Sequence, residues 1–131
     1  MDTINIETNS KFDIINITNK IQACIDKSNI NSGIAVIFIP HTTAGVSINE
    51  NADPDVLKDL KQIFNKVIPE NDNYKHFEGN SQAYALSTLT SASITVIIEN
   101  GKLVLGTWQS IYFMEYDGPR QRKAHIKIIG I

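Results

Sequence analysis

The sequence contains one cysteine, Cys24, and therefore cannot form an internal disulfide. It also lacks any apolar run near the roughly 18 residues that a membrane-spanning helix needs, so we expect no membrane partner. Residues 1–5 have neither the basic nor the apolar segment of a secretory signal peptide. These absences predict a cytoplasmic protein in which Cys24, placed in an apolar helical pattern, is a buried structural thiol.

A large excess of charge of either sign is also missing. The 12 basic and 14 acidic residues give a net charge of −2 and a pI of about 5.9. We therefore expect no nucleic-acid partner. The basic segment 120–123 is too short to follow a nucleic-acid backbone, but Arg120 and Arg122 suffice to bind one phosphate or carboxylate. Two solvated surface arginines are the structural alternative.

What is present is the composition of an ordinary globular protein. Hydrophobic residues make up 42% of the chain and charged residues 20%, which predicts a folded chain rather than a disordered one. A length of 131 residues predicts one domain, residues 1–131, able to bury roughly two-thirds of the surface of its unfolded chain.

Alternating and continuous apolar segments predict a chain rich in strands. These segments cover residues 2–8, 11–17, 33–40, 44–50, 94–98, 102–105, 108–116 and 122–130. Helical spacing predicts helices from Thr18 as N-cap to about residue 28, from Pro54 to Pro69 with Asp53 as N-cap, and over 81–91. Because most connections read as hairpins, such as Asn100-Gly101, we expect an α+β fold around antiparallel sheet with two or three helices.

The segment from His41 to Asn51 crowds polar side chains where the buried strand 33–40 ends. Rigid strands that deliver polar groups to one edge are a common way to hold a site in place. His41 is suited to bind a metal, move a proton or, when charged, grip a phosphate. Glu50 is a candidate general base or metal ligand. The structural alternative for His41 is a turn histidine bonded to a nearby carbonyl.

Two further histidines lie elsewhere in the chain. His76 falls in the polar loop 70–80, and together with His41 it makes a site for a divalent metal such as Mg²⁺ or Zn²⁺ conceivable. Neither histidine belongs to a recognised zinc-motif spacing. His125 alternates with two lysines in the last strand, so we expect it at the surface of the sheet.

Trp108 and Gln109 lie between two predicted strands, in Gly106-Thr-Trp-Gln109. The tryptophan is suited to stack on a planar ring, with Gln109 as a hydrogen-bonding partner beside it. A tryptophan of the core or of a subunit contact explains the pattern equally well.

Together these motifs closely resemble the YjbQ family, the secondary thiamine-phosphate synthase proteins. The resemblance is carried by the segments 41–54, 76–80, 93–109 and 115–120, and their order and spacing fit along essentially the whole chain. It implies a homotrimer of compact α+β subunits built from packed, mainly antiparallel, sandwich-like sheets, with a polar cleft between subunits. The implied cleft residues are His41, Thr43, Asn49, Glu50 and His76, with Trp108, Gln109 and Arg120 nearby.

The family resemblance also implies an activity. Members have been credited with a weak, secondary synthase reaction, which joins a pyrimidine diphosphate to a thiazole phosphate and releases pyrophosphate. Members commonly carry a histidine where this chain has Tyr84, and often a lysine where it has Leu86. Tyr84 offers a hydroxyl for binding substrate but is a poor zinc ligand, so only His41 and His76 remain for a metal.

Three functions follow as hypotheses. The first is an enzyme that acts on a small phosphorylated or otherwise anionic molecule, with His41, Glu50 and His76 as catalytic residues. The second is a non-catalytic module that binds or senses such a ligand. The third treats the polar motifs as contacts of the trimer, in which case mutation of Asn49 or Gln109 would yield monomers.

Overall fold

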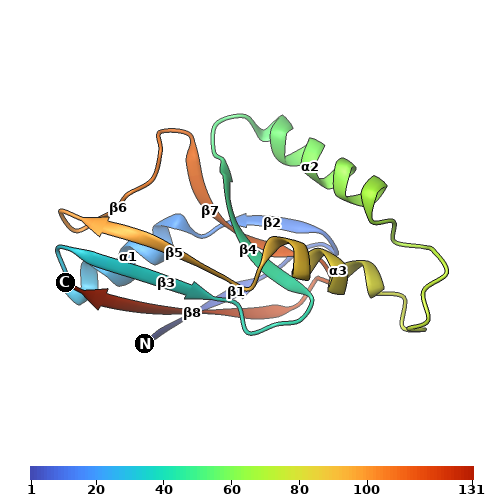
Figure 1. Cartoon of the computed structure of the whole chain (residues 1–131), viewed down its shortest axis with the longest axis horizontal. Coiled ribbons are helices and arrows are strands. Elements are labelled where there is room, and N and C mark those ends of the chain that lie inside the picture. Colours follow the sequence, from blue (N-terminus) through green and yellow to red (C-terminus); the bar gives the residue numbers. More distant parts are fainter.

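The computed structural model describes all 131 residues and arranges them as two antiparallel sheets and three helices (Figure 1). The larger sheet has the strand order β1-β8-β3-β5-β6, and the smaller one has the order β2-β7-β4. The strands are β1 (Asp2–Glu7), β2 (Asp13–Asn16), β3 (Gly33–Phe38), β4 (Ala44–Glu50), β5 (Ser93–Glu99), β6 (Lys102–Leu103), β7 (Gln109–Glu115) and β8 (Gln121–Gly130); the helices are α1 (Thr18–Ser28), α2 (Pro54–Val67) and α3 (Ser81–Thr90). This architecture confirms the predicted α+β fold.

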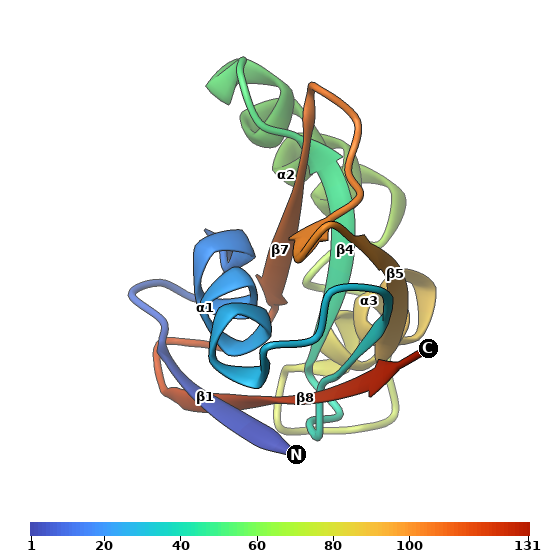
Figure 2. The ribbon, with the colours of Figure 1, turned by 90° about the vertical axis from the view of Figure 1, so that its left-hand side faces the viewer.

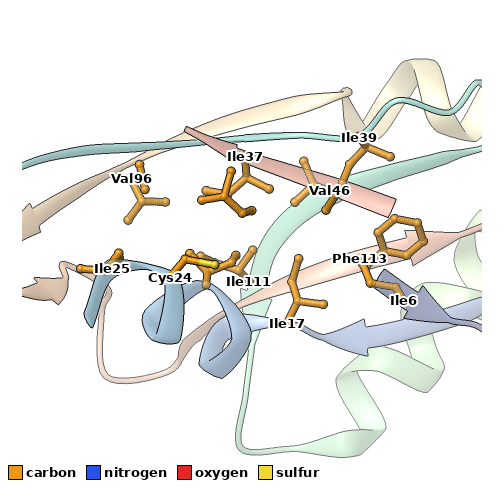
Figure 3. Packing of buried hydrophobic residues seen from close by; sticks show 14 of the residues in the cluster. Ile6, Ile17, Cys24, Ile25, Ile37, Ile39, Val46, Val96, Ile111 and Phe113 are labelled. Atoms are coloured by element: carbon orange, nitrogen blue, oxygen red, sulfur yellow. The ribbon is translucent and has the colours of Figure 1, made fainter. Parts of the chain in front are cut away.

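The main core lies between the inner face of the larger sheet, one face of the smaller sheet and α1. Alternate residues of β3, such as Ala35 and Ile37, point into this core, as the period of two of a strand requires. Figure 3 shows Ile37 of β3 on one side of this core and Ile111 and Phe113 of β7 on the other, all members of one buried cluster. Figure 2 shows α1 lying over β1 and β8. Cys24 belongs to this core, which confirms it as a buried thiol.

The other face of the smaller sheet carries a second apolar cluster. Because β7 is buried on both faces, its alternate residues Tyr112 and Met114 point away from the main core and pack beneath α2 and α3. Asp53 caps α2 as predicted, and its carboxylate accepts a hydrogen bond from the N–H of Asp55 at 2.9 Å. No residue of α2 is fully buried, and Val67 is 69% exposed. This helix thus leaves apolar side chains in solvent.

Several predicted boundaries need correction. Thr18 is the first residue of α1 rather than its cap, because its hydroxyl donates to Asn16 Oδ1 and accepts the N–H of Ile111, which ties the helix to β7. The strand predicted at 33–40 ends at Phe38, just before Pro40, which has no N–H to offer a ladder. The strand predicted at 11–17 covers only Asp13–Asn16. No helix is long and apolar enough to cross a membrane.

Candidate active site

A cleft of about 420 Å³ is lined by the segment that follows β3, by α3 with the residues just before it, and by the turn between β7 and β8 with the start of β8. Figure 1 shows where these elements lie in the fold. The lining of the cleft is strongly polar. The residues that line it are Pro40, His41, Thr42, Thr43, Glu78, Asn80, Tyr84, Asp117, Arg120 and Arg122. Of the predicted site residues, His41, Thr43, Tyr84 and Arg120 are therefore brought together here.

The base of this cleft is a buried ion pair that the sequence motifs do not reveal. Arg122 points inward from β8, and its Nε donates to Glu115 Oε2 at 2.7 Å, while its Nη2 donates to Glu115 Oε1 at 2.5 Å. Thr43 Oγ1 accepts from Nη2 at 2.8 Å, and the Thr8 hydroxyl donates to Glu115 Oε2 at 2.9 Å. None of these bonds uses Nη1 of Arg122. That group is left for the cleft, which Arg122 lines.

The protonation state of Glu115 follows from this network. Burial alone would raise the pKa of its carboxyl, but hydrogen bonds from Arg122 and from the N–H of Asp117, with the charge of Arg122, outweigh it. The pKa therefore lies below its ordinary value. Arg122 is consequently neutralised by its partner, and it acts toward the cleft as a fixed hydrogen-bond donor rather than as a free charge.

Arg120, the only other arginine in the chain, lies at the more exposed side of the cleft. Its Nη2 donates to Asp117 Oδ2 at 3.1 Å and its Nε to the Asp117 carbonyl at 2.9 Å. Asn80 also donates to Asp117 Oδ2, while its own Oδ1 is buried without a partner. A buried acceptor of this kind costs free energy unless a water or ligand satisfies it. Both arginines of the chain thus serve one cleft.

His41 is held by the larger sheet in one tautomer. Its Nε2 accepts a hydrogen bond from the backbone N–H of Lys123 at 3.0 Å, and a backbone N–H can only donate. Burial and the nearby Arg122 cation both lower the pKa of the imidazole. His41 is therefore neutral at pH 7 and carries its proton on Nδ1, which bonds to no other group of the chain. It offers the cleft a donor rather than a free base.

His76 stands beside the cleft rather than in it. Its Nε2 lies 3.7 Å from Glu78 Oε2, and its ring is nearly perpendicular to that of Tyr84, with 5.6 Å between ring centroids. The donors present do not fit a zinc site, because no three His, Cys, Asp or Glu side chains converge. The Nε2 lone pair of His41 is also already used. The metal site predicted from His41 and His76 is thus not assembled by these side chains.

The remaining predicted residues lie at the opposite end of β4. We call residues 49–51 and 106–109 the β4–β7 tip; the two segments are paired through Glu50 and Gln109 and lie side by side in Figures 1 and 2. Six residue steps of strand separate Ala44 from Glu50, roughly 20 Å at the usual rise. Within one chain, Asn49, Glu50, Trp108 and Gln109 therefore do not share the cleft with His41.

Most polar groups of the β4–β7 tip have local structural roles. Glu50 Oε2 accepts the N–H groups of Ala52 and Asp53 in the turn that leads to α2. The amide oxygen of Gln109 accepts the N–H of Gly106 at 2.7 Å, and Asn49 Oδ1 accepts the N–H of Glu50 at 2.8 Å. Trp108 is the exception, because this residue is 63% exposed.

The sequence motifs did not predict Glu115, Asn80 and Asp117 as site residues, and they did not predict that Arg122 is buried. A signal for the buried pair was present in the strand patterns. Glu115 follows Ile111 and Phe113 at a spacing of two, which places a carboxylate on the inward face of its strand. Arg122 stands in the same relation to Ala124 and Ile126. Two opposite charges at inward positions of consecutive strands predict a buried pair.

Comparison with known proteins gives one consistent result. The family model described as UPF0047 protein YjbQ-like matches residues 2–131. The UPF0047 protein MJ1081 of Methanocaldococcus jannaschii is 50% identical over 125 residues, which cover 95% of this chain and 91% of that protein. The UPF0047 protein YugU of Bacillus subtilis is 49% identical over 131 residues and covers 99% of each.

Solved structures agree with these sequence matches. A crystal structure of an uncharacterised conserved protein of the same family from Clostridium acetobutylicum superposes with a TM-score of 0.97 at 50% identity. It covers 98% of this chain and 100% of that one. A YbjQ-like protein of unknown function from Sulfolobus solfataricus gives a TM-score of 0.94 at 32% identity, with 99% of this chain and 96% of that one covered.

Proposed function

Since the chain belongs to the UPF0047 family of YjbQ-like proteins, we propose that its cleft binds a small phosphorylated or otherwise anionic molecule. The observation that carries this proposal is the pair of unused donors, Arg122 Nη1 and His41 Nδ1–H, on groups that line one cleft. Both donors are fixed in place by bonds on their far sides. Preorganised N–H groups of this kind favour an oxyanion because they need no rearrangement when it binds.

The acidic groups of the cleft do not cancel this preference. Asp117 is paired with Arg120, and Glu78 stands at the exposed rim beside His76. The charge of Glu115 is neutralised by Arg122 in the buried ion pair. An anionic group that enters the cleft therefore meets the free edges of two guanidinium groups and the Nδ1–H of a neutral imidazole.

The reaction that we propose to test first is the synthase step implied by the family resemblance. In that step a ring nitrogen of the thiazole phosphate bonds to a carbon of the pyrimidine diphosphate, and the bond from that carbon to pyrophosphate breaks. The attacking nitrogen carries no proton, so the step needs stabilisation of the departing anion rather than a base. Donors on His41, Arg120 and Arg122 suit that need.

A second function, a binding or sensing module without turnover, is favoured by one observation. The Nε2 of His41 is occupied by the Lys123 N–H and its Nδ1 carries the proton, so the cleft holds no free imidazole lone pair. A reaction that requires a general base thus finds none at His41. Measurement of pyrophosphate release at saturating substrates separates a module that only binds from an enzyme.

We also propose self-assembly as a homotrimer. Two exposed apolar features support it: Trp108 at the β4–β7 tip and the outer side of α2, where Ile63 and Val67 are 51% and 69% exposed. Contact between copies would cover both. It would also allow the β4–β7 tip of one copy, with Asn49 and Glu50, to approach the cleft of another.

The test is calorimetric titration with inorganic pyrophosphate. We expect saturable binding by the wild type and a loss of about tenfold to a hundredfold in affinity in Arg120→Ala, since a hydrogen bond to a charged group contributes about 1.5–3 kcal/mol. Lys127→Ala, an exposed change on the outer face of β8, is the matched control and should bind like the wild type. Equal affinity in wild type and Arg120→Ala would overturn the proposal.

The synthase step has its own test. If the protein catalyses this step, expression of the wild type should restore growth of a thiamine auxotroph and expression of His41→Gln should not.

A further inference from the structure

A second hollow of about 500 Å³ adjoins the cleft. We call it the hydroxyl hollow. Its lining residues are His41, Thr42, Tyr84, Ser87, Thr88, Ser91 and Ala92, of which the first three also line the cleft. The two spaces therefore meet along His41, Thr42 and Tyr84, and one elongated ligand can enter both.

Three of the four hydroxyls that α3 and its C-terminal end contribute to these walls are committed to backbone carbonyls. Ser87 Oγ donates to the carbonyl of Ala44 at 2.6 Å, and Thr88 Oγ1 donates to that of Tyr84 at 3.0 Å. Ser91 Oγ donates to the carbonyl of Ser93 at 3.3 Å. A hydroxyl has one proton and two lone pairs. Each of these side chains therefore has only lone pairs left for a ligand.

The two spaces thus differ in hydrogen-bonding character. The cleft presents N–H donors from Arg120, Arg122 and His41. Away from the shared border of His41, Thr42 and Tyr84, whose N–H and hydroxyl groups can still donate, the hydroxyl hollow presents the lone pairs of Ser87, Thr88 and Ser91. No charged side chain lines the hollow, since the imidazole at its border is neutral. A ligand group that enters the hollow displaces the water bound to these acceptors. Unless that group donates hydrogen bonds of its own, the acceptors are left unsatisfied, which costs binding free energy.

We propose that the hydroxyl hollow is a second subsite, which binds an uncharged amine- or hydroxyl-bearing end of the ligand whose anionic end lies in the cleft. This inference rests on the proposed function and narrows its substrate class. The substrate is then a small phosphorylated molecule with a hydrogen-bond-donating group at the end away from the phosphate. A simple alkyl or aryl phosphate would fill the cleft and leave the acceptors of the hollow unmatched.

The test compares two probes that differ by one donor group, phenyl phosphate and 4-aminophenyl phosphate. For the wild type we expect the amine to tighten binding by about threefold to tenfold, the usual effect of one neutral hydrogen bond. The double variant Thr88→Val/Ser91→Gly removes two of the acceptors. Valine has the shape of threonine, and Ser91 has φ of +79°, which glycine adopts freely. Thr95→Val, an exposed threonine on β5, is the matched control.

The proposal predicts that the preference for the amine disappears in the double variant and persists in Thr95→Val, while all three proteins bind phenyl phosphate equally. Binding of phenyl phosphate with no preference for the amine would overturn the subsite and leave the proposed function standing. A preference that survives in the double variant would also overturn the subsite. Failure of the wild type to bind either probe would overturn both proposals.

Discussion

Arg122 and Glu115 form an ion pair between the two sheets, with 3% and 0% of their side chains exposed. The pair joins β7 of the smaller sheet to β8 of the larger one, and Thr43 extends it to the segment that carries His41. The geometry of the cleft therefore depends on one electrostatic contact in the core. Under the proposed function Arg122 would bind the anion from that buried contact, which would couple binding and stability at this residue.

Replacement of Glu115 by glutamine should destabilise the fold strongly. The guanidinium of Arg122 would remain buried without a counter-charge, and a broken buried pair costs about 3–5 kcal/mol. Urea denaturation of wild type and Glu115→Gln measures this difference. Glu78→Gln is the control, because Glu78 is exposed and should change the free energy of unfolding by less than about 0.5 kcal/mol. Equal stability of Glu115→Gln and wild type would contradict this role of the pair.

The same pair sets a dependence of stability on pH. Because the folded-state pKa of Glu115 lies below the ordinary value of 4.5, the folded protein binds this proton more weakly than the unfolded chain does. The contribution of Glu115 is thus fully present above pH 4.5 and is lost as the pH falls through the folded-state pKa. Urea midpoints of the wild type, measured from neutral pH down into the acidic range, should fall at the acidic end. A flat profile would show that the pair is not ionised in the fold.

His41 should titrate with a pKa below its ordinary value of 6.5, because burial and Arg122 disfavour its charged form. Nitrogen-15 spectra of the imidazole at neutral pH should report a protonated Nδ1 and an unprotonated Nε2, as the bond from Lys123 requires. The ring-nitrogen signals of the exposed His76, recorded in the same sample, can be compared with those of His41. An Nε2 of His41 that carries a proton at neutral pH would contradict this tautomer.

Gly45 of β4 lies at the point where the C-terminal end of α3 packs closely on the strand. A Cβ at this position would lie 2.4 Å from Thr90 Oγ1 and 2.9 Å from the Ser91 carbonyl oxygen. Gly45→Ala should therefore cost about 1–3 kcal/mol of stability through overpacking, and should displace the end of α3 that borders the hydroxyl hollow. At Gly106 the nearest atom would be the flexible Gln109 Oε1 at 3.2 Å. We expect Gly106→Ala to cost less in the same thermal or urea melt, and the reverse order would refute this packing.

Trp108→Ala should weaken assembly without unfolding the subunit. The side chain is 63% exposed in the single chain, so its removal takes little from the core. Light scattering after size exclusion should show trimers for the wild type and a shift to smaller species for the variant. Phe77→Ala, another exposed aromatic change, serves as the control that keeps the oligomer. Trimers that persist in Trp108→Ala would remove the β4–β7 tip from the interface.

Local sequence patterns were enough to predict most elements of the fold. The continuous apolar run of β3, the alternation in β8, the Asp53-Pro54 helix start and the Asn100-Gly101 hairpin are encoded by neighbouring residues, and the structure has each of them. Where the prediction failed, a distant contact decided. Thr18 does not cap α1 because its hydroxyl is engaged by Asn16 and by Ile111, which is 93 positions away in the sequence.

The site was predicted less completely for the same reason. His41, Tyr84 and Arg120 meet only because the β3–β4 segment, α3 and the β7–β8 turn converge in space. Nearness in sequence does not place Glu50 beside His41 within one chain, since a strand carries it roughly 20 Å away. The roles of Arg122 and Glu115 depend on inward register, which is visible in the sequence only once the strands are aligned against the core.

Binding of an anionic group in the cleft beside His41 and Arg122 is the property on which both proposals depend. It can be observed residue by residue when the nitrogen-15-labelled protein is titrated with inorganic pyrophosphate and the amide chemical shifts are followed. We predict saturable shifts in the amides of residues 41–43, 80–84, 117–118 and 120–123, which surround the cleft. Absence of saturable shifts, or shifts that leave these segments unmoved, would contradict the proposed binding.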